Sequence, residues 1–311
     1  MRTNLSALVS VVLLAAMAGC GVSSAPFHTS TSPAQSGPVA CWGDSLTQGN
    51  QDLTGVSYPG VLGQLVSVPI YNEGIDGQTS SQVAARMLAA KNMYGYTGVL
   101  WAGRDDYKQK SNPESDVLAN IASMVNALTS SPKRYLVLSV PNGDGVWELK
   151  GTEVYNRIMT LNSAMAAAYP DHYLDIRSYL VSQYDPTQPL DVFDHDNDVW
   201  PASLRAHNVT GSLAAPVGDS DTTIYMNVTS HARPIESYTL EVDSEFMDVT
   251  AVTAPTAPNG PYVLKVIRGW ANTTVTPHQA NTVMAGIDPL HLNADGYTKV
   301  AQQVANWLNS Q

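Results

Sequence analysis

Short apolar segments alternate with amphipathic stretches along most of this 311-residue chain. The apolar segments end near Gly, Asn or Pro, as buried strands do when a turn follows them. The expected strands are residues 39–42, 66–71, 99–101, 135–140 and 173–176. Three helices are expected. One contains Val117, Ile121, Met124, Val125 and Leu128 at helical spacing, and a second contains Ile158, Leu161, Met165 and Ala168. The third covers residues 294–308. The alternation predicts an α/β fold built on a parallel sheet.

A serine directly follows the first expected strand. Residues 39–42 lead into Gly43-Asp44-Ser45-Leu46, so Ser45 lies at the carboxyl end of a strand, where open α/β sheets place their sites. Near the other end of the chain, Asp288 precedes His291 by three residues. A serine hydroxyl becomes a good nucleophile when a base takes its proton and a carboxylate orients that base. Either motif alone is weak, because Gly, Asp and Ser are ordinary turn formers.

Two further segments lie between these motifs, Asn-Glu-Gly-Ile-Asp-Gly-Gln-Thr-Ser at 72–80 and Trp-Ala-Gly-Arg-Asp-Asp-Tyr at 101–107. The four segments, in this order, resemble the four sequence blocks of the SGNH (GDSL) hydrolase family. The resemblance covers roughly residues 38–207 and 286–311. It implies a flavodoxin-like three-layer α/β/α fold with a parallel sheet and no cofactor.

The same resemblance implies a role for each site residue. Ser45 corresponds to the nucleophile, His291 to the general base and Asp288 to the partner that orients the base. The oxyanion hole of the family corresponds to the backbone N–H of Ser45, the backbone N–H of Gly77 and the side chain at position 105.

Position 105 departs from the family pattern, because Asp105 stands where the family has asparagine. An asparagine amide donates to a developing oxyanion, whereas an ionised carboxylate accepts and repels it. Burial that keeps Asp105 protonated would restore a donor, and a neighbouring donor would also serve. Pairing with Arg104 would instead keep the carboxylate ionised, but adjacent strand residues point to opposite faces, which disfavours that pairing. Asp44 and Arg104 are further candidates for contact with the substrate.

The N-terminal residues predict export and lipidation. Arg2 precedes an apolar stretch at 5–18 that is short for a membrane span but typical of a signal peptide. The stretch ends in Met-Ala-Gly-Cys, which resembles a bacterial lipobox with Cys20 as the lipidated residue. We therefore expect a signal peptide at 1–19, a flexible Ser-, Thr- and Pro-rich tether at 20–37, and a lipid-anchored protein of the bacterial envelope outside the cytoplasm. An ordinary signal peptide is the alternative.

An insertion interrupts the hydrolase pattern at residues 208–285, so the hydrolase domain is expected at 38–207 and 286–311. Within it, residues 222–228, 238–242, 245–252 and 262–267 are rich in strand formers and separated by Pro, Gly, Asn and Ser. This pattern predicts that the insertion is a small all-β module, and its position next to the segment with His291 predicts that the module lies at the mouth of the active site. Segments at 241–249, 266–269 and 273–278 resemble a β motif of phage tail and baseplate proteins.

Three aromatic residues of the module are candidates for stacking on sugar rings. Tyr238 and Tyr262 are more readily explained as the core of the module, and Trp270, after Arg268-Gly269, is the better surface candidate.

The acidic run Asp191, Asp194, Asp196 and Asp198 lacks the glycine and glutamate of a calcium loop, so we expect a solvated loop near the rim of the site.

Charge and cysteine content restrict the partners. The formal net charge of −11 disfavours binding of the folded part to nucleic acid or to anionic lipid, so membrane attachment depends on the lipid at Cys20.

Only Cys20 and Cys41 occur, so a lipidated chain has no internal disulfide, and Cys41 is expected to be a buried apolar residue. No Cys/His cluster predicts a zinc site. The oligomeric state is open.

These features favour an extracytoplasmic serine esterase that hydrolyses short-chain or acetyl esters through an acyl-enzyme, with acylated glycans as the preferred substrate class. Simple esters and lysophospholipids come next. Two other hypotheses remain: a catalytically impaired SGNH scaffold that binds carbohydrate or envelope components, and a protein whose β module serves oligomerisation or docking.

Overall fold

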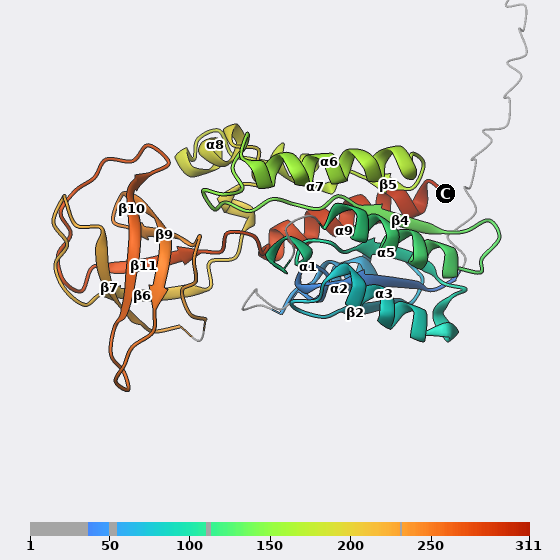
Figure 1. The fold of residues 1–311 in the computed structure, drawn as a ribbon, viewed down its shortest axis with the longest axis horizontal. Coiled ribbons are helices and arrows are strands. Elements are labelled where there is room, and N and C mark those ends of the chain that lie inside the picture. Colours follow the sequence, from blue (N-terminus) through green and yellow to red (C-terminus); the bar gives the residue numbers. More distant parts are fainter. Residues whose placement is uncertain (1–36, 50–54, 110–112, 231) are drawn as a thin grey trace, which may run out of the picture. The chain divides into compact units, whose positions relative to one another are not determined.

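The computed structural model describes residues 37–49, 55–109, 113–230 and 232–311 (Figure 1). The expected signal peptide, Cys20 and almost all of the tether lie outside the described residues. The described part contains a parallel sheet, helices and an antiparallel barrel, all within one compact unit. Within these described ranges, no helix has the length and apolar character needed to span a bilayer.

The parallel sheet has five strands in the order β2-β1-β3-β4-β5, which confirms the predicted fold class. The strands are β1 (Val39–Gly43), β2 (Ile70–Gly74), β3 (Thr97–Trp101), β4 (Tyr135–Leu138) and β5 (Tyr173–Leu174). The helices are α1 (Ser45–Gln48), α2 (Tyr58–Leu65), α3 (Ser80–Ala89), α4 (Asp106–Gln109), α5 (Glu114–Ala127), α6 (Glu153–Ala168), α7 (Ile176–Val181), α8 (Pro189–Asp196) and α9 (Ala294–Asn309), with 3-10 turns η1 (Lys91–Met93) and η2 (Ala202–Leu204). β1 lies between β2 and β3, at the centre of the strands that carry the site.

Side chains of β1 alternate between two apolar cores. Val39 and Cys41 pack in a core with α2, α7 and α9, whereas Ala40 and Trp42 pack in a second core with α3, α5 and α6. Because successive strand residues point to opposite faces, one strand contributes to both cores, and the result is three layers. Burial raises the pKa of the Cys41 thiol to about 12, so this residue is an inert part of the core.

Two local predictions were wrong. Residues 66–68 are not part of a strand, because α2 extends to Leu65 and β2 begins only at Ile70. Apolar residues continue from the end of that helix into the strand, so periodicity alone does not mark the boundary. The acidic run is not a solvated loop: Asp191 and Asp194 lie on α8 and are 2% and 0% exposed.

The buried aspartates of this region hold a buried arginine. Arg205 Nη1 lies 2.8 Å from Oδ2 of Asp144, and Nη2 lies 2.7 Å from Oδ2 of Asp194. Burial favours the neutral guanidine, but the charges of Asp144 and Asp194 raise the pKa of Arg205 above its usual value. The ion pairs connect the end of α8 with the loop after β4.

Residues 209–287, which include most of the predicted insertion, form a closed antiparallel barrel with strand order β10-β7-β6-β11-β8-β9. Its strands are β6 (Val209–Leu213), β7 (Thr223–Val228), β8 (Thr239–Val242), β9 (Glu245–Thr253), β10 (Tyr262–Trp270) and β11 (Val283–Ile287). The expected β-rich segments match four of these strands, while β6 and β11 were missed. β11 ends one residue before Asp288, so the barrel leads directly into the predicted catalytic segment.

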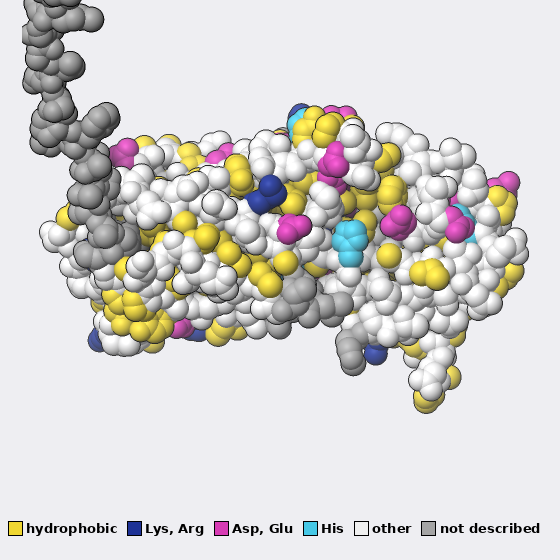
Figure 2. Space-filling model, turned by 180° about the vertical axis from the view of Figure 1, so that it is seen from behind, with side chains coloured by type: hydrophobic (Ala, Val, Ile, Leu, Met, Phe, Trp, Pro, Cys, Tyr) yellow, Lys and Arg dark blue, Asp and Glu magenta, His cyan; other side chains and the backbone are white. Residues whose placement is uncertain are grey.

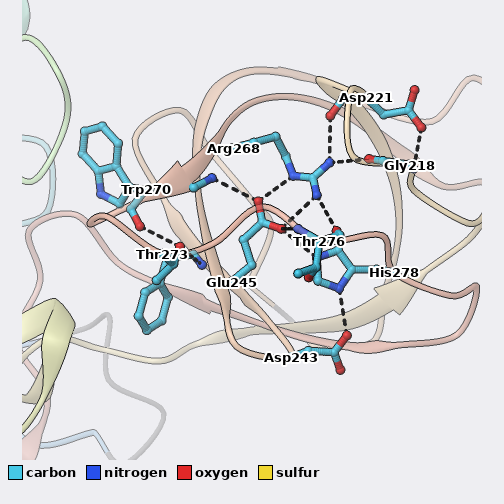
Figure 3. Close-up of polar contacts among 11 residues, drawn as sticks. Gly218, Asp221, Asp243, Glu245, Arg268, Trp270, Thr273, Thr276 and His278 are labelled. Atoms are coloured by element: carbon cyan, nitrogen blue, oxygen red, sulfur yellow. Dashed lines mark hydrogen bonds and ion pairs between the residues drawn. The ribbon is translucent and has the colours of Figure 1, made fainter.

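A buried glutamate organises one end of the barrel (Figure 3). Both carboxylate oxygens of Glu245 accept from Arg268, at 2.6 and 2.8 Å, and Oε2 lies 2.9 Å from Nε2 of His278. Burial raises the pKa of Glu245, but hydrogen bonds from Arg268 and His278 outweigh it and lower the pKa to about 2. Arg268 also donates to the backbone oxygen of Gly218, which ties a neighbouring loop to β10.

Replacing Arg205 with Met is expected to lower the free energy of unfolding by about 3–5 kcal/mol, because it leaves two carboxylates buried without their cation. The matched control is Arg157→Met, which removes an ion pair with Glu114 whose side chains are each 22% exposed, and it should cost less than about 1 kcal/mol. Urea denaturation of both variants measures the difference. Equal losses would contradict a structural role for the buried network.

Candidate active site

The turn after β1 depends on glycine. A Cβ at Gly43 would lie 2.1 Å from Oγ1 of Thr47 and 2.4 Å from the backbone oxygen of Trp101, so any other residue would clash. Asp44 then caps α1, since its side chain accepts from the backbone N–H of Leu46 at 3.0 Å. This local geometry places Ser45 as the first residue of α1, just beyond the carboxyl end of β1.

The structure brings Ser45, His291 and Asp288 together in one chain of contacts. His291 Nε2 lies 2.9 Å from Oγ of Ser45. His291 Nδ1 lies 3.0 and 3.1 Å from the two carboxylate oxygens of Asp288. A nucleophile within hydrogen-bond reach of a base, with that base held by a carboxylate, is the geometry that activates a serine hydroxyl.

Asp288 is held as a carboxylate by its own loop. Oδ1 accepts from the backbone N–H groups of Leu290 and His291, at 2.9 and 2.7 Å. Burial raises the pKa of Asp288, but the neighbouring His291 and these hydrogen bonds together hold it below its usual value. Asp288 therefore remains ionised and can stabilise a positively charged imidazole.

The loop with Asp288 and His291 is anchored on residues 205–206. The backbone N–H of Asp288 donates to the oxygen of Ala206 at 2.8 Å, and the N–H of Ala206 donates to the oxygen of His291 at 2.8 Å. Arg205 Nη1 also donates to the backbone oxygen of Asp288, at 3.1 Å. The buried ion pairs described above thus support the backbone of the predicted catalytic loop.

The residues predicted for the oxyanion hole lie on the turns that follow β1, β2 and β3. Gly77 has a φ of 71°, a conformation that favours glycine. Its turn starts beside the serine, because the N–H of Ile75 donates to the oxygen of Gly43 at 3.1 Å. Asp105 is 3% exposed, and the adjacent Asp106 accepts from the N–H of Ser80 at 2.6 Å, which joins the third block to the start of α3.

Two carboxyl groups lie close together beside the serine. Burial, and then the negative charge of Asp105, raise the pKa of the Asp44 carboxyl to about 7, and the charges of His291 and Arg104 act in the opposite direction. Near neutral pH, Asp44 is therefore protonated in an appreciable fraction of molecules.

Arg104 is buried and pairs with Glu148, at 2.8 Å between Nη2 and Oε1. Its guanidinium also lies near enough to Asp44 and Asp105 for their charges to raise its pKa. Arg104 therefore lies near both carboxyl groups, and its contact with the substrate stays a prediction.

Trp270 was predicted as a surface residue that stacks on sugars, and this prediction was wrong. It is 9% exposed and packs edge-on against Phe193, with 5.1 Å between ring centroids. Leu190, Ala202 and Ile287 complete this apolar cluster. Trp270 therefore packs between β10 and α8. The local sequence around it does not indicate this contact.

Sequence reasoning missed a site contact made by Tyr238. It was interpreted as core, and it is buried among the apolar residues of the barrel. Its hydroxyl, however, lies 2.9 Å from Oδ2 of Asp288. Nothing in the surrounding β pattern distinguishes Tyr238 from an ordinary core tyrosine.

The described residues do not form a cluster of three or more His, Cys, Asp or Glu side chains suited to a metal ion. On the face shown in Figure 2, lysine and arginine side chains are few and scattered.

Comparisons with known proteins identify the class. A family model described as the GDSL-like Lipase/Acylhydrolase family matches residues 41–207, and the chain belongs to this family. The chain is similar to the solved structure of AlinE4, an SGNH-hydrolase family esterase, at 17% identity over 46% of this chain and 77% of that chain, with a TM-score of 0.36. A lipase/acylhydrolase from Enterococcus faecalis is 17% identical over 50% of this chain and 83% of that chain, with a TM-score of 0.40. No curated protein matches the chain.

Proposed function

We propose that this member of the hydrolase family is a serine esterase that cleaves short-chain or acetyl esters through an acyl-enzyme. The observation that carries the proposal is the continuous contact from Ser45 through His291 to Asp288. Each group has the chemistry its role needs: a hydroxyl, an imidazole within reach of it, and a carboxylate with a lowered pKa.

The proposed reaction has two halves. His291 Nε2 takes the proton of Ser45 as the serine oxygen attacks the ester carbonyl, and the imidazolium then gives that proton to the leaving alcohol. Water attacks the acyl-serine in the second half, with His291 again as the base, and the carboxylic acid leaves. Asp288 stabilises the imidazolium in both halves without taking its proton.

The oxyanion that forms on attack needs donors at the site. The backbone N–H groups of Ser45 and Gly77 are the proposed main-chain donors. We propose that the Asp44 carboxyl, whose pKa is raised by burial and by the charge of Asp105, offers the O–H donor that an asparagine would otherwise provide. This assignment makes the oxyanion hole sensitive to pH.

The proposed substrate is an acylated glycan whose alcohol half binds beside His291. A cavity of about 270 Å³ is lined by residues 288–291, by residues of the 143–148 loop and by barrel residues 235–237. Its lining includes His291 but not Ser45, Gly77 or Asp105, and this supports its assignment to the leaving alcohol rather than to the acyl group. Glu148 and Glu236 offer acceptors to hydroxyl groups, Ile235 offers an apolar surface, and Trp147 on the same loop is 70% exposed.

We further propose that the enzyme is lipid-anchored through Cys20 on the bacterial envelope, outside the cytoplasm. The apolar stretch at 5–18 and the Met-Ala-Gly-Cys ending support this location. An envelope enzyme would meet acylated polysaccharides as its natural esters.

The first prediction concerns the nucleophile. The purified protein should hydrolyse p-nitrophenyl acetate, and Ser45→Ala should lower kcat by at least about 1000-fold, because the acyl-enzyme can no longer form. Release of p-nitrophenol measures both proteins, with Ser163→Ala, a serine on the exposed side of α6, as the control. Absence of serine-dependent turnover at any pH would favour the non-catalytic binding protein.

The second prediction concerns Asp105. Turnover should fall as pH rises through about 7, where Asp44 loses its proton. Asp105→Asn should remove this fall and raise kcat above that pH by about tenfold or more, because an amide donates at every pH. The matched control is Asp171→Asn, which removes an exposed carboxylate. A flat pH profile with no gain from Asp105→Asn would reject the protonated Asp44 as the donor.

The third prediction concerns the cavity. Ile235→Ala should lower kcat/KM for singly acetylated methyl glucopyranosides about fivefold to tenfold more than for p-nitrophenyl acetate, because the truncated side chain loses apolar contact with the sugar ring. Ile267→Ala is the matched control, since Ile267 is 40% exposed against 53% for Ile235 and does not line the cavity. Equal losses on the sugar ester for both variants would place the alcohol elsewhere.

A further inference from the structure

The inserted barrel reaches the catalytic carboxylate through two consecutive residues. Tyr238 directly precedes β8, Thr239 is the first residue of that strand, and their side chains contact different aspartates. The Tyr238 hydroxyl contacts Oδ2 of Asp288 at 2.9 Å, and the Thr239 hydroxyl donates to Oδ2 of Asp144 at 2.7 Å. Asp144 in turn pairs with Arg205, which donates to the backbone oxygen of Asp288. One strand start therefore reaches both the side chain and, indirectly, the backbone of Asp288.

We propose that Tyr238 is a positioning residue of the active site. The barrel then contributes to catalysis by positioning Asp288, and it also lines the cavity. The inference rests on the proposed function, because it assigns Tyr238 a role through Asp288 and His291. Tyr238 itself touches none of the reacting atoms.

The tyrosine proton is directed to the carboxylate. The hydroxyl lies 2.9 Å from Asp288 and 3.0 Å from Oδ1 of Asn208, and a bond to a charged acceptor is the stronger of the two. Burial, followed by the negative charge of Asp288, raises the pKa of Tyr238. The phenol therefore remains a donor over the working range of an esterase.

The donor set of Asp288 shows why this proton matters. Oδ1 accepts from the backbone of its own loop, at Leu290 and His291, whereas Oδ2 accepts from Tyr238. Both oxygens lie within reach of the imidazole. The tyrosine thus limits rotation of the carboxylate and draws electron density away from the oxygen nearest the barrel.

Loss of the phenol should have two effects. A carboxylate with one donor fewer is more basic and stabilises the imidazolium more, so activity should begin only at higher pH. A less constrained carboxylate orients the imidazole less well, so kcat should fall while KM changes little. The other groups facing His291 and Asp288, which are Ser45, Asp44, Arg104 and Arg205, stay in place.

The test compares Tyr238→Phe with Tyr262→Phe, a half-buried tyrosine of the same barrel core, in the purified protein. With p-nitrophenyl acetate, Tyr238→Phe should move the acid limb of the pH–kcat profile to higher pH and lower kcat about threefold to tenfold, with KM within twofold. Tyr262→Phe should leave the profile as in the wild type.

Site-specific 3-fluorotyrosine at 238 preserves the shape of the side chain and donates more strongly, so it should move the acid limb to lower pH.

A second readout does not depend on turnover. The midpoint of the NMR titration of the His291 ring should rise in Tyr238→Phe and fall with fluorotyrosine. Unchanged midpoints in folded variants would overturn the proposal and leave Tyr238 as a core residue. Shifted midpoints in a protein without esterase activity would instead reject the proposed function and retain the contact. If Tyr238→Phe does not fold, the fluorotyrosine protein decides the question alone.

Discussion

The structure depends on how one buried carboxylate is held. Asp288 follows the last barrel strand, precedes the closing helix and supports the imidazole that contacts Ser45. A buried charge is costly unless hydrogen bonds and an opposite charge compensate it. Here the compensation comes from three sources: the N–H groups of its own loop, the neighbouring His291, and a phenol from the barrel. The hydrolase fold and the insertion meet at this group.

The buried arginine explains why the arrangement can be rigid. Arg205 joins Asp144 and Asp194 and donates to the backbone of Asp288, while Thr239 of the barrel contacts the same Asp144. The carboxylates that surround this guanidinium are fully buried, so their geometry is fixed by the pairing rather than by solvent. Removal of the barrel would therefore also remove contacts on which the site depends.

Much of the fold was predictable because it depends on short-range pattern. β1 and β2 end at the glycines that close their segments, and the alternation of β1 residues between two cores reproduces the layered architecture. The pattern failed where an apolar stretch runs from a loop into a strand, as at 66–71, and where charged residues turned inward, as Asp191 and Asp194 do on α8. Periodicity does not indicate which partner a buried charge will find.

The sequence by itself determined the class of protein and named Ser45, Asp288 and His291 as candidate catalytic residues, because each lies in a short segment that can be recognised without knowledge of the fold. Tertiary structure alone decided that Trp270 is buried, that Arg104 pairs with Glu148 and that Tyr238 contacts Asp288. Each of these facts joins residues far apart in the chain. Such contacts arise from how whole elements pack, and packing is a property of the folded molecule that no local pattern encodes.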